Sequence, residues 1–344
     1  MADPNAAGPI ALDYAPNVPA RGALPRIMTL VCWGIFVSTA AQTGPGLLAE
    51  LPIRDLLQKP GAALKMSTFF FVAMFPWYLK PLAGLLSDAF PLLGTRRKSY
   101  MILGAVSAGV LWLVLGSVPH RYGPMLAAAV LMNVALIVVS SSTAGLLVEG
   151  GQRLGASGRL SSARLVVMSA AIILGAPCGG VLAEHHLFWL TAVINAAILF
   201  SLVPAVVLLL HEPRSAVPER GVFHNAWSQI KHLACSGIMW GAAGMLFLMI
   251  ASPGFNSPLY EHLKDDLGFS QTFIGNLQAV YGGAGVAAAL CYAWACRRMN
   301  LRKLLTMSLI LAAAGVLPFF ALHSHVHGLI AYATWGFGSI MAQL

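Results

Sequence analysis

Lys80 is the residue with the clearest potential for chemistry, because it lies in an apolar stretch, residues 65–86, that is long enough to cross a bilayer. An ammonium group inside a membrane is unfavourable unless it is paired or faces a water-filled cavity. Pro76 and Pro81 lie on either side of it, and each removes a backbone hydrogen bond, so a kink is expected there. Two roles follow for Lys80: it binds an anionic group of a solute, or it pairs with a neighbouring helix and holds a conformation.

A charged cluster follows at the end of the same stretch. It consists of one acidic residue and three basic residues, with glycines that allow close helix approach and a tight turn. The simpler explanation is a group of cytoplasmic basic residues with one counter-charge. We interpret the cluster as a conformational latch formed by Gly84, Asp88, Gly94, Arg96, Arg97 and Lys98.

Four other polar residues lie in or beside apolar stretches. They are candidates for hydrogen bonds to the same solute that Lys80 would bind. Hydrogen bonds between helices explain them equally well, and such bonds contribute typically less than about 2 kcal/mol each. These candidate substrate-binding residues are Gln42, Asn256, Asn276 and Tyr281.

Motifs for other kinds of chemistry are weak. The histidine groups at 185–186 and 323–327 fall in predicted loops, where solvated side chains are more common than metal ligands. The five cysteines have no metal-ligand spacing, and no G-x-x-x-x-G-K-[ST] motif for phosphate binding occurs. The spans contain no paired carboxylates, no histidine cluster and no nucleophile beside a base. We therefore expect no enzyme, no metal site and no cofactor.

The composition indicates a membrane protein. Of 344 residues, 58% are hydrophobic and 10% are charged, whereas soluble domains carry roughly 25% charged residues. A bilayer-spanning helix needs about 20 apolar residues, and helices are the only spanning form that stretches of this length allow. Ten candidate spans are expected, at 27–47, 65–86, 99–118, 123–147, 162–183, 187–210, 236–254, 271–294, 302–322 and 327–344.

The distribution of basic residues predicts the orientation. With the N-terminus in the cytoplasm, fifteen Lys and Arg residues fall in cytoplasmic segments and five in outside loops. We therefore expect a multi-pass protein, of the cytoplasmic membrane, with its N-terminus inside. Membrane topology also explains the net charge of +9 without nucleic acid as a partner.

A weak internal repeat predicts two related halves. Pro45-Gly46 and Pro253-Gly254 each follow the first helix of a half, and basic runs follow the second and eighth spans. Parallel repeats of this kind are typical of facilitator-type transporters. The expected organisation is a disordered cytoplasmic tail at 1–26, a six-helix half at 27–210, a cytoplasmic loop at 211–235, and a second half at 236–344 that holds about four helices and is therefore incomplete.

Residues 69–104, FFFVAMFPWYLKPLAGLLSDAFPLLGTRRKSYMILG, carry a family resemblance. The pattern around Asp88, Arg96 and Arg97 resembles the loop motif of the major facilitator superfamily. The insertion AFPLL and the preceding PWxxKP resemble the folate-biopterin transporter family. That family usually has acidic residues in the fourth helix where this chain has Ser140 and Ala144, so only Glu149 of the pattern is present. This chain is therefore expected to be a divergent member.

The resemblance implies a major facilitator fold and a secondary transporter. The expected solute is small, anionic or heteroaromatic, like a pterin or folate, and it would move by alternating access, with protons as the family's expected coupling ion. The missing carboxylates of the fourth helix give little support to proton coupling. The alternative is a facilitator-like membrane protein that does not transport, such as a pigment-assembly factor or a scaffold for a partner protein.

Overall fold

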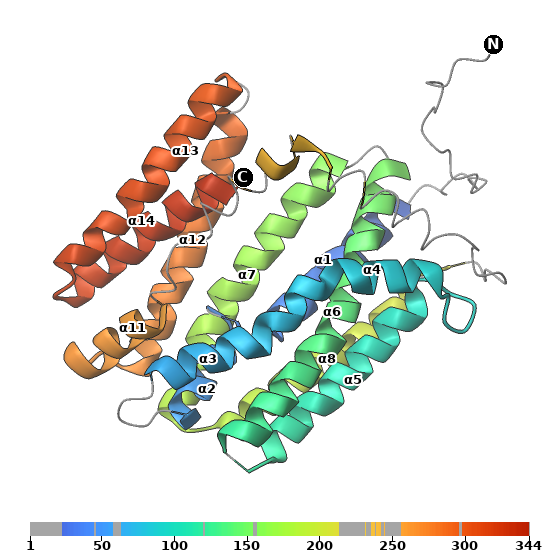
Figure 1. Ribbon diagram of the computed structural model, residues 1–344, viewed down its shortest axis with the longest axis horizontal. Helices are drawn as coiled ribbons and strands as arrows, with labels where there is room; N and C mark the ends of the chain where they lie inside the picture. Colours follow the sequence, from blue (N-terminus) through green and yellow to red (C-terminus); the bar gives the residue numbers. More distant parts are fainter. Residues whose placement is uncertain are drawn as a thin grey trace.

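Figure 1 shows the computed structural model of the chain. It describes residues 23–44, 46–57, 63–119, 121–153, 157–212, 231, 235–237, 239–241, 244, 256–295 and 298–343. Throughout these residues the ordered elements are helices, and the β-structure is limited to an isolated bridge between Leu92 and Thr95. The described part of the chain is therefore all-helical.

The first group of helices follows the predicted spans closely, with a short helix added after the first span. It comprises α1 (Ala23–Ala40), α2 (Glu50–Leu57), α3 (Ala63–Met74), η1 (Phe75–Leu79), α4 (Lys80–Ala89), α5 (Lys98–Ser117), α6 (Tyr122–Arg153), α7 (Ser157–Glu184) and α8 (Phe188–Leu209).

The second group comprises α11 (Asn256–Glu261), η2 (His262–Asp266), α12 (Gln271–Ala295), α13 (Leu301–Val316), η3 (Leu317–Ala321) and α14 (His325–Gln343). The span expected at 236–254, the loop expected at 211–235 and the tail at 1–26 fall largely outside the described residues. The division into two halves at these bounds therefore stays a prediction.

Seven helices within the described part of the chain are long and apolar enough to cross a membrane, and a shorter apolar helix covers Pro25–Ala40. The span predicted at 327–344 is helical, as α14, but is not one of the seven. The seven run over Lys65–Ser87, Lys98–Ser117, Tyr122–Gln152, Ala163–Glu184, Phe188–Leu209, Gln271–Tyr292 and Arg302–Ala321.

The kink expected beside Lys80 is present as a change of helix type. Helix α3 gives way to the 3-10 turn η1 at Phe75, and α4 starts at Lys80. Pro76 and Pro81 each lie in the first turn of a new segment, where a missing N–H costs least. Lys80 therefore lies at a joint between two helical segments within one span.

The two groups pack side by side through α7 and α12, and α13 and α14 lie further out (Figure 1). Small residues make this contact close: a Cβ on Gly275 would meet the Ala176 carbonyl oxygen at 2.5 Å, and one on Gly180 would meet that of Gln271 at 2.6 Å. Close approach at small residues is how helices associate where lipid replaces water.

Candidate functional site

Lys80 is half-buried at the start of α4 and faces α6. Its Nζ donates a hydrogen bond to Ser140 Oγ at 2.8 Å and lies 5.5 Å from the centroid of the Trp77 ring. The Ser141 hydroxyl donates to the Lys80 carbonyl oxygen at 3.1 Å, which satisfies a backbone acceptor at the joint. Ser140 is one of the positions where the family pattern has an acid, so here a neutral hydroxyl accepts the hydrogen bond of the ammonium.

A chain of hydrogen bonds holds the Trp77 ring in place. Trp77 Nε1 donates to Asn133 Oδ1 at 3.0 Å, and Asn133 Nδ2 donates to Thr43 Oγ1 at 3.2 Å and to the Ala129 carbonyl at 2.9 Å. Asn133 is fully buried in α6. Helix α6 and the segment after α1 therefore fix the aromatic surface beside Lys80, and sequence reasoning missed Asn133 and Trp77.

A second basic residue influences Lys80. Arg164, an exposed residue of α7, is close enough to repel the ammonium. Among the residues whose side chains the structure describes, no carboxylate lies within ion-pair distance of Lys80. Lys80 therefore has no counter-charge among the described side chains.

Two of the other four predicted solute ligands have partners of their own in the structure. Gln42 Nε2, just after α1, donates to the Ser38 carbonyl of that helix at 2.9 Å, and the Tyr281 hydroxyl lies 2.9 Å from Ser339 Oγ on α14. Asn276 is exposed on α12, and the side chain of Asn256 lies outside the description. No hydrogen bond described for these residues reaches Lys80, and all four stay candidates.

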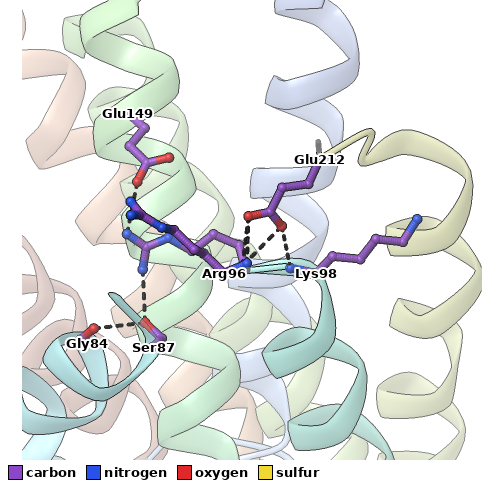
Figure 2. A network of polar contacts seen from close by, with 7 residues as sticks. Gly84, Ser87, Arg96, Lys98, Glu149 and Glu212 are labelled. Carbon is purple, nitrogen blue, oxygen red and sulfur yellow. Dashed lines mark hydrogen bonds and ion pairs between the residues drawn. The ribbon is translucent and has the colours of Figure 1, made fainter. Parts of the chain in front are cut away.

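Four of the predicted latch residues, Gly84, Arg96, Arg97 and Lys98, take part in the network of polar contacts that Figure 2 shows. The Arg97 side chain is buried and donates to Glu149 Oε1 at 2.9 Å and to Ser87 Oγ at 3.1 Å, and Ser87 in turn donates to the Gly84 carbonyl at 2.8 Å. A Cβ on Gly145 would collide with the guanidinium group, so this glycine of α6 makes room for it. One arginine thus joins α4, α5 and α6.

Glu212, just after α8, completes this network from the other side (Figure 2). Its carboxylate accepts the backbone N–H groups of Arg96 at 2.8 Å, of Arg97 at 3.1 Å and of Lys98 at 2.9 Å. Lys98 Nζ donates to the Leu210 carbonyl at 3.3 Å. A carboxylate on free N–H groups at the start of a helix is favourable, so Glu212 fastens the end of α8 to α5.

We call this set the Arg97 network: Ser87, Arg96, Arg97, Lys98, Glu149 and Glu212. Of the latch residues, Gly94 adopts a positive φ of 78°, which supplies the tight turn that was expected. Nothing is described of the Asp88 side chain. Glu212 was missed because its partners lie 114 to 116 positions away, and its only sequence signal is a carboxylate directly after a span.

A second buried arginine was also missed. Sequence reasoning placed residue 54 in a loop, whereas α1 ends at Ala40, the chain turns at Gly46 with a φ of 75°, and α2 buries Glu50 and Arg54. Arg54 Nε donates to Glu50 Oε1 at 2.9 Å, and the Gly46 N–H donates to Glu50 Oε2 at 2.5 Å. Two charges separated by four residues were the available signal for a helix here.

The same end of the protein carries further polar contacts between elements. Asp55 lies 2.6 Å from His186 Nδ1 and 3.7 Å from Lys264 Nζ, and Glu184 accepts hydrogen bonds from the backbone and side chain of Thr272. Because Lys264 and Thr272 belong to the second group of helices, these contacts hold the two groups together at this end.

Two histidines of the second predicted loop, His325 and His327, contact neighbouring side chains of the protein. The His325 ring lies 4.5 Å from the rings of both Phe269 and Phe273, and Ser324 lies 3.0 Å from His327 Nδ1. In the described residues, no group of three or more His, Cys, Asp or Glu side chains is arranged to hold a metal ion.

Comparison with solved structures concerns the fold. A D-xylose-proton symporter, a major facilitator protein, superposes with a TM-score of 0.57 at 12% sequence identity, covering 94% of this chain and 81% of its own. At that identity the likeness establishes the architecture alone. The predicted major facilitator fold of a multi-pass membrane protein is thereby confirmed, although the number of spans is not.

Comparison of sequences identifies the relatives. A folate-biopterin transporter of Synechocystis is 26% identical over 274 residues, which are 73% of this chain and 51% of the relative. Folate transporter 2 of Plasmodium falciparum is 21% identical over 73% of this chain and 55% of its own length. The chain thus spans about half the length of these relatives, whose names are those of transporters and not of enzymes. The model of the BT1 family matches residues 62–324, and the chain therefore belongs to the BT1 family, as the resemblance predicted.

Proposed function

We propose that the protein is a secondary transporter for a folate- or pterin-like solute, which it moves by alternating access between its two groups of helices. Membership of the BT1 family over residues 62–324 is the observation that carries this proposal. The named relatives transport folate or biopterin, and the major facilitator fold is one in which two halves rock about a central site.

The anionic character of the solute rests on Lys80. A carboxylate of the solute would replace the acid that the family pattern has at position 140 and would lie between two positive charges, those of Lys80 and Arg164. The Trp77 ring, which is held by Asn133, offers a flat surface on which a heteroaromatic ring can stack. Charge recognition and stacking at one place suit a pterin that bears an acidic tail.

Several further parts of the proposal follow from the charge distribution. The distribution of basic residues supports a cytoplasmic N-terminus. The membrane would then be the cytoplasmic membrane. The Arg97 network then lies on the cytoplasmic side, and together with Gly84, Asp88 and Gly94 it acts as the conformational latch. Protons are the coupling ion that the superfamily suggests, while exchange of one solute for another needs no proton site.

Substitution of Lys80 tests the proposal. The purified full-length protein is titrated with a pterin, with folate and with a neutral pterin that lacks the carboxylates, and binding is followed by thermal shift. Lys80→Ala should weaken folate binding at least about tenfold, because a partly desolvated charge pair is lost, and should leave the neutral pterin nearly unaffected. Lys80→Arg should keep part of the affinity, since the charge remains but its position changes.

Lys65→Ala is the matched control, because Lys65 is an exposed lysine at the other end of the same span. If Lys80→Ala bound folate as the parent does while the neutral pterin bound equally well, the lysine would be structural and the anionic part of the proposal would fail. Absence of binding by all three compounds in the folded parent would instead contradict the solute class.

A further inference from the structure

Arg54 is a buried arginine whose contacts come from both groups of helices. Within α2 it pairs with Glu50. Across the seam, which is the contact between the two groups of helices, its Nη1 donates to Ser257 Oγ on α11 at 3.3 Å. Its guanidinium carbon lies 4.8 Å from the ring centroid of Phe70 on α3 and 4.9 Å from that of Tyr260 on α11. A single side chain therefore connects α2 and α3 to α11. We call these five residues the Arg54 network.

An apolar cluster continues the same contact. Leu51 of α2 and Ala183 of α7 are buried in one cluster with Tyr260, Leu277 and Tyr332 of the second group. Burial raises the pKa of the Tyr260 hydroxyl, which accepts a hydrogen bond from Gln271 Nε2 at 2.6 Å. The phenol therefore stays neutral beside the guanidinium and offers its ring as a cation–π surface.

The arrangement of donors allows this contact to open without leaving a buried charge unpaired. Glu50 and Arg54 belong to the same helix, and the second donor to Glu50 is the N–H of Gly46, in the same segment. Movement of α11 away from α2 would remove Ser257 and Tyr260 from Arg54 but would leave the ion pair intact. After the helices separate, water would reach the Glu50 carboxylate and the Arg54 guanidinium and would solvate both groups well.

We propose that Arg54 is the positioning residue that holds this end of the solute path closed, by inserting its guanidinium between Phe70 and Tyr260. Closure dehydrates the Glu50–Arg54 pair and opening hydrates it, while the pair itself persists. This role rests on the proposed alternating access and adds to it the contact that must break, which is that of Arg54 with Ser257 and Tyr260. A guanidinium suits this role better than an ammonium, because its flat face stacks on both rings while its edge still donates to Glu50 and Ser257.

The test measures closure directly and needs no solute. Leu51, which is 2% exposed, is replaced by cysteine in the full-length protein after its native cysteines have been changed to alanine. The rate of maleimide labelling in detergent then reports how often the contact opens. Arg54→Lys and the double variant Glu50→Gln with Arg54→Met should each label about tenfold faster, as expected if a minor open state rises from about 1% to about 10%.

Two controls separate opening from unfolding. Arg121→Gln removes an exposed arginine from another predicted outside loop and should not change the rate. A cysteine at Leu160, which is 1% exposed and packs against α1 in the first group, should label at the parent rate in every variant. The double variant removes both charges together, so it does not strand a buried carboxylate and is expected to fold.

Each outcome decides the inference. Faster labelling at position 51 with an unchanged rate at position 160 supports the proposal that Arg54 holds the contact between α2 and α11 closed. Equal labelling of parent and variants at position 51 would overturn it, and so would a parallel rise at both positions, because that would mean general loosening. Neither result depends on a solute, so a failure here differs from a failure of folate binding at Lys80.

Discussion

The Arg97 network and the Arg54 network use the same groups for different purposes. Each centres on a buried arginine that pairs with one glutamate at 2.9 Å. The first joins α4, α5, α6 and the end of α8, which all belong to one group of helices, whereas the second joins α2 and α3 to α11 across the seam. The partners of an arginine, and not its burial, therefore decide whether it stiffens a group of helices or closes a contact between two.

The two ion pairs also differ in their access to water. The Glu149 side chain is 42% exposed, whereas that of Glu50 is 4% exposed. A half-exposed carboxylate can be hydrated when its partner is lost, but a buried one cannot. The two networks should therefore respond differently when each loses its arginine.

The largest expected effect comes from removing one arginine at a time. Arg54→Met should destabilise the protein by about 3–5 kcal/mol, because it leaves Glu50 buried with the Gly46 N–H as its remaining described donor. Arg97→Met should cost clearly less, since water can solvate Glu149. Thermal unfolding of the two variants, in the same detergent and lipid as the parent, measures both losses of stability. Equal losses of stability would show that exposure of the carboxylate does not distinguish the two pairs.

The same pair of variants separates stiffening from gating. Arg97→Lys should lower thermal stability yet leave the labelling rate of a cysteine at position 51 unchanged, because Arg97 ties α4 and α6 to the start of α5 through Ser87 and Glu149. If labelling at position 51 rose as much as it does in Arg54→Lys, the contrast between the two networks would be lost.

A smaller effect is expected from the glycine that makes room for Arg97. Gly145→Ala places a Cβ where the guanidinium lies, so α6 and α5 must separate or Arg97 must leave Glu149. Overpacking of this kind costs typically about 1–3 kcal/mol. Gly283→Ala on α12 is the control, because a Cβ there meets nothing within 4 Å. It should leave stability unchanged or raise it slightly, since alanine favours helix more than glycine does.

Spans and kinks were predictable because they depend on local features of the chain. Apolar length places the helices, and the prolines at 76 and 81 place the joint at Lys80. The basic run at 96–98 was predicted as part of a latch on the family motif, but its partner Glu212 was not, since only the fold brings the end of α8 to α5. Arg54 was assigned to a loop because charged residues break the apolar run, and its burial depends on the contact with α11.

The smallest effect we predict concerns Glu212, and it tests whether the Arg97 network also fixes the segment that follows α8. Its carboxylate accepts three backbone N–H groups at the start of α5. Glu212→Gln keeps one oxygen acceptor but removes the charge that the helix N-terminus favours, so we expect a loss of about 1 kcal/mol. Hydrogen exchange should show the amides of Arg96, Arg97 and Lys98 exchanging faster, with the rest of α5 unchanged. Glu261→Gln, a half-exposed glutamate of α11, is the control and should change neither quantity. Unchanged exchange at all three amides would mean that the carboxylate of Glu212 does not hold α5 in solution, and the Arg97 network would then end at Glu149.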